Sequence, residues 1–319
     1  MILTIILFAA GLGLILYGAN LLTDGASALA RRFNMSELVI GLTIVALGTS
    51  LPELVISLGA ALQGSPGISL GNVVGSNIFN SLLILGTTAL IFPVTFSKKM
   101  LTREIPFNLL ASIALTLLAG SMIYAGSGEG EYITRNGGMI LLCFLAIFIR
   151  YTFSIAKDDS SEEESGPQMS PIKIALCIAG GLAGLIIGGK LFVNSATEIA
   201  TAMGLSEAII GITIVSAGSS LPELAVSVNA ARKKNVGIAL GNVLGSNILN
   251  IFLILGCTAT ICPIELSQFN FVDFYTLIGS SVLIYIVGFF VGKATITRAE
   301  GALLVCCYIA YTVYLIMNN

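Results

Sequence analysis

Ten apolar stretches, most of them about 20 residues long, constrain the fold of this chain more than any other feature. A stretch of that length is what a helix needs to cross about 30 Å of hydrocarbon. Charged residues make up only 10% of the sequence, against about 25% in soluble domains, and the mean hydropathy is +0.97. We therefore predict an all-α integral membrane protein with ten transmembrane helices. The stretches run roughly over 2–22, 38–62, 68–92, 105–125, 138–155, 172–194, 208–231, 237–262, 271–292 and 299–317.

The basic residues are divided unevenly between the connecting segments. Of the 15 Lys and Arg residues, 13 fall in alternate connections, while Arg135 lies on the other side and Lys190 lies within a stretch. Basic residues concentrate on the cytoplasmic side of a membrane protein. We expect a multi-pass protein of the cell membrane with both termini outside the cell. This orientation agrees with an even number of spans. The 13 residues are Arg31, Arg32, Lys98, Lys99, Arg103, Arg150, Lys157, Lys173, Arg232, Lys233, Lys234, Lys293 and Arg298.

An internal repeat divides the chain. Residues 41–86 and 211–256 align without a gap at an offset of 170, and 28 of the 46 positions are identical. The match continues on both sides at the same offset, pairing Gly18 with Gly188 and Pro93 with Pro263. Each extended repeat holds five apolar stretches, so the second repeat enters the membrane from the opposite side. Inverted repeats of this kind are typical of secondary transporters, whose binding site lies where the repeats meet. We predict a first five-helix repeat over 1–155, an acidic cytoplasmic linker over 156–171 and a second, inverted repeat over 172–319.

Two acidic residues lie well inside the predicted spans, and they occupy equivalent positions in the repeats. These are Glu53 and Glu223. A carboxylate in the hydrocarbon region costs about 2.5–3.5 kcal/mol or more, so such residues usually serve a function. The alternative is a protonated glutamate that only holds helices together. No Lys or Arg lies nearby in sequence to pair with either residue, which favours an ion site.

Each glutamate follows a motif that breaks a helix. The sequences Gly48-Thr49-Ser50-Leu51-Pro52-Glu53 and Gly218-Ser219-Ser220-Leu221-Pro222-Glu223 place proline where it removes a backbone donor. Carbonyl groups freed around such a break can face a cation. Hydroxyl groups add further oxygen ligands, from Thr49, Ser50, Ser219 and Ser220.

The next stretch in each repeat carries polar residues spaced by four, and so on one face of a helix. The first set is Asn72, Ser76 and Asn80, and the second is Asn242, Ser246 and Asn250. These side chains could instead hydrogen-bond between helices, while the neighbouring glycines permit close packing. Carboxylate, amide, hydroxyl and carbonyl oxygens together suit a hard cation such as Ca²⁺. The sequence has no histidine, and soft transition metals would normally recruit Cys or His.

The two motif pairs resemble the repeats of the sodium/calcium exchanger family, in particular its prokaryotic members, within the cation/calcium antiporter superfamily. The resemblance covers nearly the whole chain and implies exchange of Na⁺ for Ca²⁺ by alternating access. It also implies that Glu53 and Glu223 bind Ca²⁺ with backbone oxygens of Thr49 and Ser219, and that Na⁺ sites flank them. The implied ligands are Ala46, Thr49, Ser50, Glu53, Ser76 and Asn80, with Ser216, Ser219, Ser220, Glu223, Ser246 and Asn250.

Several alternatives remain open from the sequence. Proton-coupled relatives resemble one another in a GNxxE pattern, whereas the fifth position here is Gly75 or Gly245. Some relatives, including the potassium-dependent branch, carry Asp where this chain has Asn250. Both departures favour Na⁺/Ca²⁺ exchange over H⁺/Ca²⁺ or K⁺-dependent exchange. A cation channel is a further alternative, and an intramembrane hydrolase is disfavoured because no His could act as base. We expect no enzymatic activity and no cofactor, with Ca²⁺, Na⁺ and the lipid bilayer as partners and no nucleic acid.

Overall fold

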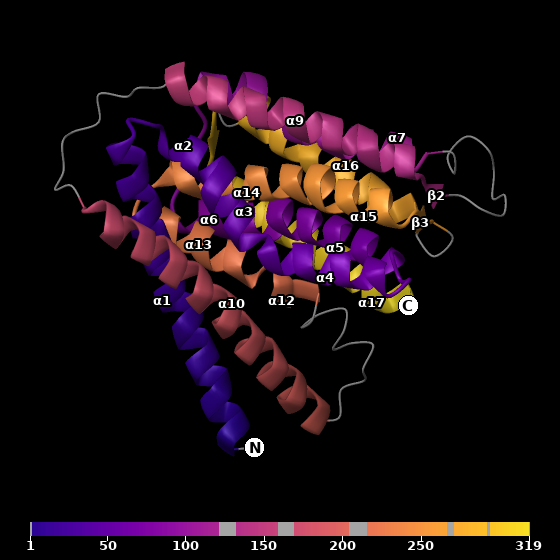
Figure 1. Cartoon of the computed structure of the whole chain (residues 1–319), viewed down its shortest axis with the longest axis horizontal. Helices are drawn as coiled ribbons and strands as arrows, with labels where there is room; N and C mark the ends of the chain where they lie inside the picture. The colour runs from indigo at the N-terminus through magenta and orange to yellow at the C-terminus, as the bar shows by residue number, and fades with distance from the viewer. Residues whose placement is uncertain are drawn as a thin grey trace.

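The fold is built almost entirely from helices that are apolar enough to lie in a bilayer (Figure 1). The computed structural model describes residues 2–120, 132–158, 169–203, 216–266, 271–291 and 294–318. Within these ranges, eight helices are long and apolar enough to cross a membrane, or nine if a bent pair over Glu37–Thr49 and Leu51–Leu62 forms one span. The chain is thus an all-α membrane protein. The predicted seventh span, 208–231, lies partly outside the described residues.

The α-helices that the structure describes in both halves follow the same order. The first half comprises α1 (Ile2–Arg32), α2 (Glu37–Ile40), η1 (Gly41–Val45), α3 (Ala46–Thr49), α4 (Leu51–Leu62), α5 (Gly67–Ile78), η2 (Phe79–Ile84), α6 (Leu85–Ile91), η3 (Met100–Glu104), α7 (Ile105–Leu118) and α9 (Arg135–Asp158). The second half comprises α10 (Pro171–Ala202), α12 (Ser216–Ser219), α13 (Leu221–Arg232), α14 (Val236–Leu249), η5 (Asn250–Leu255), α15 (Gly256–Ile261), α16 (Phe271–Ile286), η6 (Val287–Val291) and α17 (Arg298–Asn318). The elements labelled η are π-helical turns.

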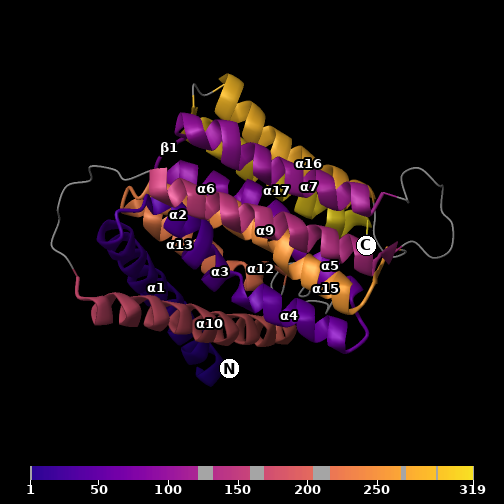
Figure 2. The same ribbon diagram turned by 45° about the horizontal axis from the view of Figure 1, so that its top comes forward.

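Helices α1 and α10 pack against each other along one edge of the bundle (Figures 1 and 2). Glycines let the two backbones approach closely. A Cβ atom at Gly18 would lie 2.8 Å from the carbonyl oxygen of Gly181, and one at Gly188 would lie 2.8 Å from that of Gly11. Both helices extend beyond the spans expected over 2–22 and 172–194. The added turns carry small polar residues, such as Thr23 and Ser27, which are buried by tertiary packing.

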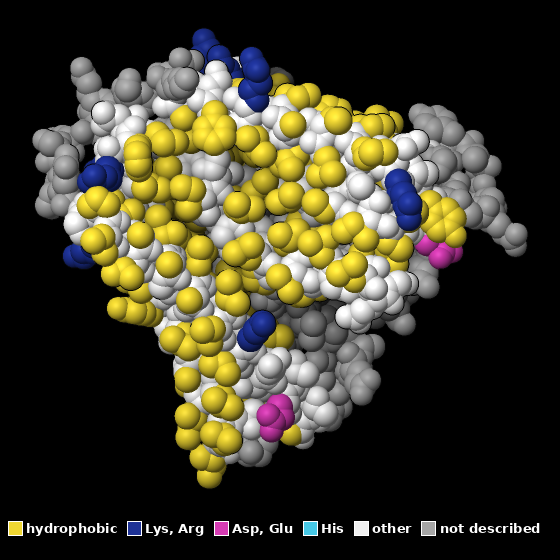
Figure 3. Space-filling model, in the orientation of Figure 1, with side chains coloured by type: hydrophobic (Ala, Val, Ile, Leu, Met, Phe, Trp, Pro, Cys, Tyr) yellow, Lys and Arg dark blue, Asp and Glu magenta, His cyan; other side chains and the backbone are white. Residues whose placement is uncertain are grey.

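The core centres on α14, η5 and α15, a continuous segment in which 94% of the most apolar window is buried. By contrast, only 11% of the corresponding window of α17 is buried. Hydrophobic side chains cover most of the face drawn in Figure 3, and basic side chains lie chiefly along its edges. This distribution is opposite to that of a soluble protein and is what a surface in contact with lipid requires.

Two pairs of short antiparallel strands connect distant loops. Strand β1 (Val94–Thr95) pairs with β4 (Thr295–Ile296), and β2 (Tyr132–Ile133) pairs with β3 (Ile264–Glu265). Each pair joins one loop of the first half to one of the second half. The loops expected on the cytoplasmic side are therefore paired together, as are the loops expected outside. The sequence motifs did not predict these strands.

One acidic residue lies deeper than the sequence analysis placed it. Glu104 precedes the predicted span 105–125, but the structure begins this span at Met100 and buries Glu104 to 1% exposure. Its Oε1 atom accepts a hydrogen bond of 2.7 Å from the hydroxyl of Tyr151 on α9. Glu53 and Glu223 are therefore not the only buried acids within the described spans.

Candidate ion-binding site

The two glutamates begin helices that follow equivalent breaks. Ser50 separates α3 from α4 with φ −83° and ψ 6°, and Ser220 separates α12 from α13 with φ −90° and ψ 7°. The helix axis bends by 47° at the first break. Proline lies in the first turn after each break, where its missing N–H needs no partner. Glu53 and Glu223 then occupy the first turn, where the N-terminus of the helix favours a negative charge.

The two breaks meet in the interior, and each places a serine against the glutamate of the other repeat. The hydroxyl of Ser50 donates to Oε1 of Glu223 over 3.0 Å, and the hydroxyl of Ser220 donates to Oε1 of Glu53 over 3.2 Å. Ser220 also lies 3.0 Å from the hydroxyl of Ser76 on α5. Glu53 is 0% exposed and Glu223 is 1% exposed, and two ionised carboxylates buried in these contacts would repel each other. A cation between them would remove this repulsion.

A second reciprocal layer surrounds the first. The hydroxyl of Thr49 donates to Oδ1 of Asn242 over 3.0 Å, and that of Ser219 donates to Oδ1 of Asn72 over 3.3 Å. The amide nitrogen of Asn242 in turn donates to Ser227, and that of Asn72 donates to Ser57. Asn72 and Asn242 therefore hold the helix breaks in position. Ser57 and Ser227 escaped the sequence analysis, although each lies four residues after a glutamate, on the same helical face.

Several buried oxygens at the centre have no hydrogen-bond partner among the described residues. They are Oε2 of Glu53, Oε2 of Glu223, Oδ1 of Asn80, Oδ1 of Asn250 and Oγ of Ser246. Buried polar atoms in native proteins are nearly always satisfied, so this group of acceptors points to a ligand that supplies positive charge. These acceptors are oxygens, the ligands that Na⁺ and Ca²⁺ accept. The amide nitrogen of Asn80 is the one side-chain nitrogen among the described residues that is also buried without a partner.

The helices widen where the second motif ends. The π-helical turn η2 begins at Phe79 and contains Asn80, and η5 begins at Asn250. Such turns are rare and frequently lie at functional sites, because they shift side chains relative to a regular helix. In each set the first two polar residues lie on a regular α-helix. The third, Asn80 or Asn250, lies in the π-helical turn.

The centre of the interface departs from the symmetry of the repeats. Asn77 donates to the backbone oxygen of Asn247 over 3.0 Å, whereas Asn247 donates to the hydroxyl of Ser81 over 2.9 Å. The equivalent of Ser81 is Ile251, which has no hydroxyl. Asn250 donates to Oδ1 of Asn77 over 3.1 Å, while neither amide atom of Asn80 has a partner among the described residues. The two halves of the site are therefore chemically distinct.

The structure brings ten of the twelve predicted ligand residues together as buried side chains, and Ala46 and Ser216 need separate description. Ala46 is fully buried, and its carbonyl oxygen accepts from the backbone nitrogen of Ser50 and lies 3.3 Å from the hydroxyl of Thr49. The backbone of Ser216 begins α12, but its side chain lies outside the described part. The other ten residues are buried side chains on or between α3, α4, α5, η2, α12, α13, α14 and η5: Thr49, Ser50, Glu53, Ser76, Asn80, Ser219, Ser220, Glu223, Ser246 and Asn250. Their role as ligands stays a prediction.

The arrangement is that of a membrane carrier for hard cations, with an oxygen-lined site between two related halves. The sequence pattern of the sodium/calcium exchanger protein family matches residues 3–154 and 173–317. The chain belongs to this family. Its family and fold are those of transporters, and the transported ions of the family are Na⁺ and Ca²⁺.

Individual relatives of known sequence and structure support the assignment to this family. The sodium/calcium exchanger MaX1 of Methanosarcina acetivorans is 32% identical, with 96% of both chains covered. The inner membrane protein YrbG of Escherichia coli is 35% identical, with 87% of this chain and 86% of the relative covered. A solved structure of the sodium-calcium exchanger NCX_Mj, soaked with Na⁺ and Ca²⁺, superposes with a TM-score of 0.82 at 34% identity over 97% of each chain.

Proposed function

We propose that this protein exchanges Na⁺ for Ca²⁺ across the cell membrane by alternating access, with Glu53 and Glu223 as the central ligands. The observation that carries the proposal is the reciprocal pairing of each glutamate with a serine of the other repeat, Ser220 and Ser50. Helices of both halves must keep their relative position for these contacts to exist. A movement of one half against the other would therefore change the site itself.

The proposed architecture has ten transmembrane helices in two inverted repeats, 1–155 and 172–319, joined by the cytoplasmic linker 156–171. Both termini lie outside. The uneven distribution of basic residues supports this orientation. The pairing of β1 with β4 and of β2 with β3 supports it too, since each pair joins loops that the scheme puts on the same side.

Charge balance favours Ca²⁺ as the central ion. Two ionised glutamates neutralise one divalent cation, and serine, threonine and asparagine oxygens complete the 6–8 ligands that Ca²⁺ takes. Several Na⁺ ions could use subsets of the same oxygens. Competition for shared ligands is the simplest way to couple the two ions, because Ca²⁺ and a full set of Na⁺ ions would then not occupy the site together.

The driving ion in this proposal is Na⁺. The positions that carry glutamate in the GNxxE pattern are Gly75 and Gly245 in this chain, so no third carboxylate is supplied there to carry a proton. The residue at position 250 is Asn, which leaves the centre with two carboxylates. The alternative is an H⁺-driven or K⁺-dependent exchanger.

The deciding experiment is ⁴⁵Ca²⁺ uptake into proteoliposomes. Vesicles loaded with Na⁺ and diluted into Na⁺-free buffer should accumulate Ca²⁺, and uptake should saturate with external Ca²⁺. Vesicles that contain the protein and are loaded with K⁺ or with an acidic buffer should show no more uptake than vesicles without the protein. Equal uptake driven by a pH gradient would refute Na⁺ coupling. Uptake that does not depend on any counter-ion gradient would favour a channel.

A further inference from the structure

Two contacts that the repeat symmetry makes equivalent differ in this structure. At the offset of 170, α1 corresponds to α10 and α13 corresponds to α4. The contact of α1 with α13 should therefore resemble the contact of α10 with α4. Val226 on α13 is 0% exposed and packs in one cluster with Leu22 and Ala26 of α1. Its equivalent on α4, Ile56, is 45% exposed.

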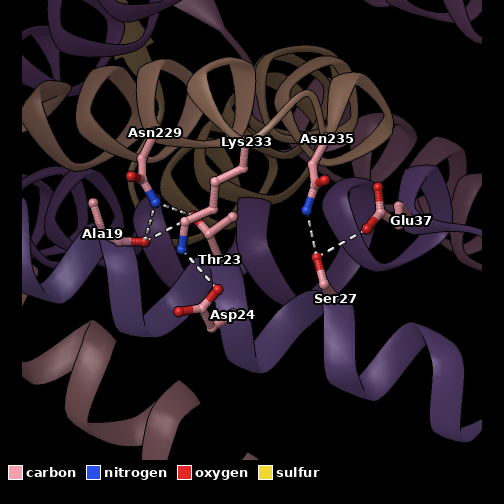
Figure 4. Close-up of polar contacts among 8 residues, drawn as sticks. All are labelled: Ala19, Thr23, Asp24, Ser27, Glu37, Asn229, Lys233 and Asn235. Carbon is pink, nitrogen blue, oxygen red and sulfur yellow. Dashed lines mark hydrogen bonds and ion pairs between the residues drawn. The ribbon is translucent and has the colours of Figure 1, made fainter. Parts of the chain in front are cut away.

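The contact between α1 and α13 is closed and carries polar bonds at its end (Figure 4). Lys233 forms an ion pair of 2.7 Å with Asp24 of α1. One turn earlier, Asn229 donates to the hydroxyl of Thr23 over 3.0 Å and to the backbone oxygen of Ala19 over 3.3 Å. These bonds join the first helix of the chain to the second repeat.

Further side-chain hydrogen bonds join α1 to the loop that follows α13. Asn235 donates to the hydroxyl of Ser27 over 2.7 Å, and Ser27 donates to Oε1 of Glu37 over 2.9 Å. Figure 4 shows these side chains in a row between the helices. The row fastens α1 to α13 and to the start of α2 on what we propose is the cytoplasmic side.

The contact between α10 and α4 is open. A cavity of about 220 Å³ separates Pro52, Val55 and Ile56 of α4 from Leu185, Gly189 and Val193 of α10. It is also lined by Ser219, a residue of the candidate site. The equivalents of Asp24 and Lys233 are Asn194 and Gln63. Both side chains are exposed.

We propose that the Asp24–Lys233 ion pair and its neighbouring hydrogen bonds form a one-sided lock for alternating access. Helices α1 and α10 pack together as one unit. The lock holds this unit against α13, and so keeps α10 away from α4. When α1 and α10 move together toward α4, Asp24 and Lys233 separate, and Gln63 and Asn194 approach each other. This inference rests on the proposed function, because a protein that does not alternate needs no second closed contact.

The chemistry of the two ends makes the device asymmetric. An ion pair with hydrogen bonds closes one end, and two neutral amides would close the other. Hydrogen bonds with charged groups are stronger than neutral ones. The lock therefore biases the protein toward the conformation in which the end at Lys233 is closed. Since Asp24 is 42% exposed and Lys233 is 29% exposed, the bias of the ion pair is about two- to fivefold.

The test measures how often the second contact closes. In a background without the six native cysteines, Gln63→Cys and Asn194→Cys are introduced together, and the rate of cross-linking is followed without Na⁺ or Ca²⁺. Adding Asp24→Asn or Lys233→Gln should raise the rate about two- to fivefold. The exchanged pair Asp24→Lys with Lys233→Asp should bring it back toward the starting rate.

Arg232→Gln is the matched control, since it removes one positive charge next to Lys233 and leaves the ion pair intact. The lock is refuted if Arg232→Gln accelerates cross-linking as much as Lys233→Gln does. It is also refuted if the cysteine pair cross-links in no background while the protein exchanges ions. Cross-linking that responds as expected in a protein whose Ca²⁺ uptake needs a counter-ion gradient other than Na⁺ would retain alternation and the lock and refute Na⁺ as the driving ion.

Discussion

The hydroxyl of Ser50 lies 3.0 Å from Oε1 of Glu223, although 173 residues separate the two along the chain. The equivalent contact of Ser220 with Glu53 is 3.2 Å long. Each repeat thus supplies the carboxylate of one half-site and the hydroxyl of the other. A half-site cannot form within a single repeat, so the proposed ion site requires both halves. In this proposal, a bound ion would directly affect how the halves are positioned.

Removal of either central charge should abolish exchange. In Glu53→Gln or Glu223→Gln, bound Ca²⁺ would keep an uncompensated charge in a buried site, which costs several kcal/mol. Since each 1.4 kcal/mol is about tenfold in affinity, we expect a loss of more than about 100-fold in Ca²⁺ affinity. The measurement is ⁴⁵Ca²⁺ uptake together with the shift in melting temperature that Ca²⁺ causes, which should vanish in both variants.

The control for this charge removal is Glu300→Gln. Glu300 accepts a bond of 2.6 Å from the backbone nitrogen of Thr297 at the start of α17, and glutamine can fill the same capping role. This variant should keep both uptake and stabilisation by Ca²⁺. Near-normal transport in Glu53→Gln or Glu223→Gln would show that the central site has been assigned wrongly.

The serines that cross between the repeats should matter less than the glutamates but more than ordinary buried hydroxyls. A hydrogen bond to a charged group contributes about 1.5–3 kcal/mol. Ser50→Ala and Ser220→Ala should therefore raise the half-saturating Ca²⁺ concentration about tenfold or more. Ser220 contacts both Glu53 and Ser76, so its replacement should be the more severe.

The matched control for these serine variants is Ser112→Ala. The hydroxyl of Ser112 is buried and bonds to Ser281 over 2.9 Å, at the packed interface of α7 and α16. Its loss should lower the melting temperature without changing the half-saturating Ca²⁺ concentration. Equal shifts in that concentration for Ser112→Ala and Ser220→Ala would mean that the serines act on stability alone.

Much of the candidate site could be predicted from the sequence because the repeat displays it twice. A glutamate after a Ser-Leu-Pro break is unusual in an apolar stretch, and its recurrence at an offset of 170 predicts a function. The match to the sodium/calcium exchanger family confirms the resemblance predicted from these motifs. Residues such as Ser57 and Asn247 recur at the same offset, but serine and asparagine also serve helix packing in membranes, so their recurrence alone does not indicate a site. Only their hydrogen bonds to Asn72 and Ser81 reveal where they act.

The ends of the helices were predicted less well. Residues 23–32 contain small and polar side chains that fit a loop as well as a helix, and the prediction ended the first span at residue 22. In the structure the helix continues to Arg32 because Thr23 and Ser27 bond to α13 and the loop after it. The burial of Glu104 has the same kind of cause, since Tyr151 donates a hydrogen bond to its Oε1 atom from a helix distant in sequence. Such choices depend on tertiary contacts that a local pattern does not contain.

The proposed orientation can be tested by labelling single cysteines in a background without native cysteines. Ser65→Cys lies between α4 and α5 and is exposed, so an impermeant maleimide should label it in intact cells. Lys98→Cys, exposed in a loop rich in basic residues, should be labelled only after permeabilisation. The opposite pattern would reverse the orientation and put both termini in the cytoplasm.

The asymmetry at the centre predicts different behaviour for two equivalent asparagines. Asn250 donates to Asn77 over 3.1 Å, whereas neither amide atom of Asn80 has a partner among the described residues. Asn250→Ala should therefore lower the melting temperature even without Ca²⁺, since it leaves the buried Oδ1 of Asn77 without this donor. Asn80→Ala should leave the melting temperature without Ca²⁺ unchanged and reduce only the stabilisation that Ca²⁺ adds. Both variants should keep some exchange, because each removes a neutral ligand that water can partly replace. Melting curves at several Ca²⁺ concentrations separate the two effects. If Asn80→Ala lost stability without Ca²⁺ but kept the full increment on adding it, Asn80 would be a packing residue rather than a ligand.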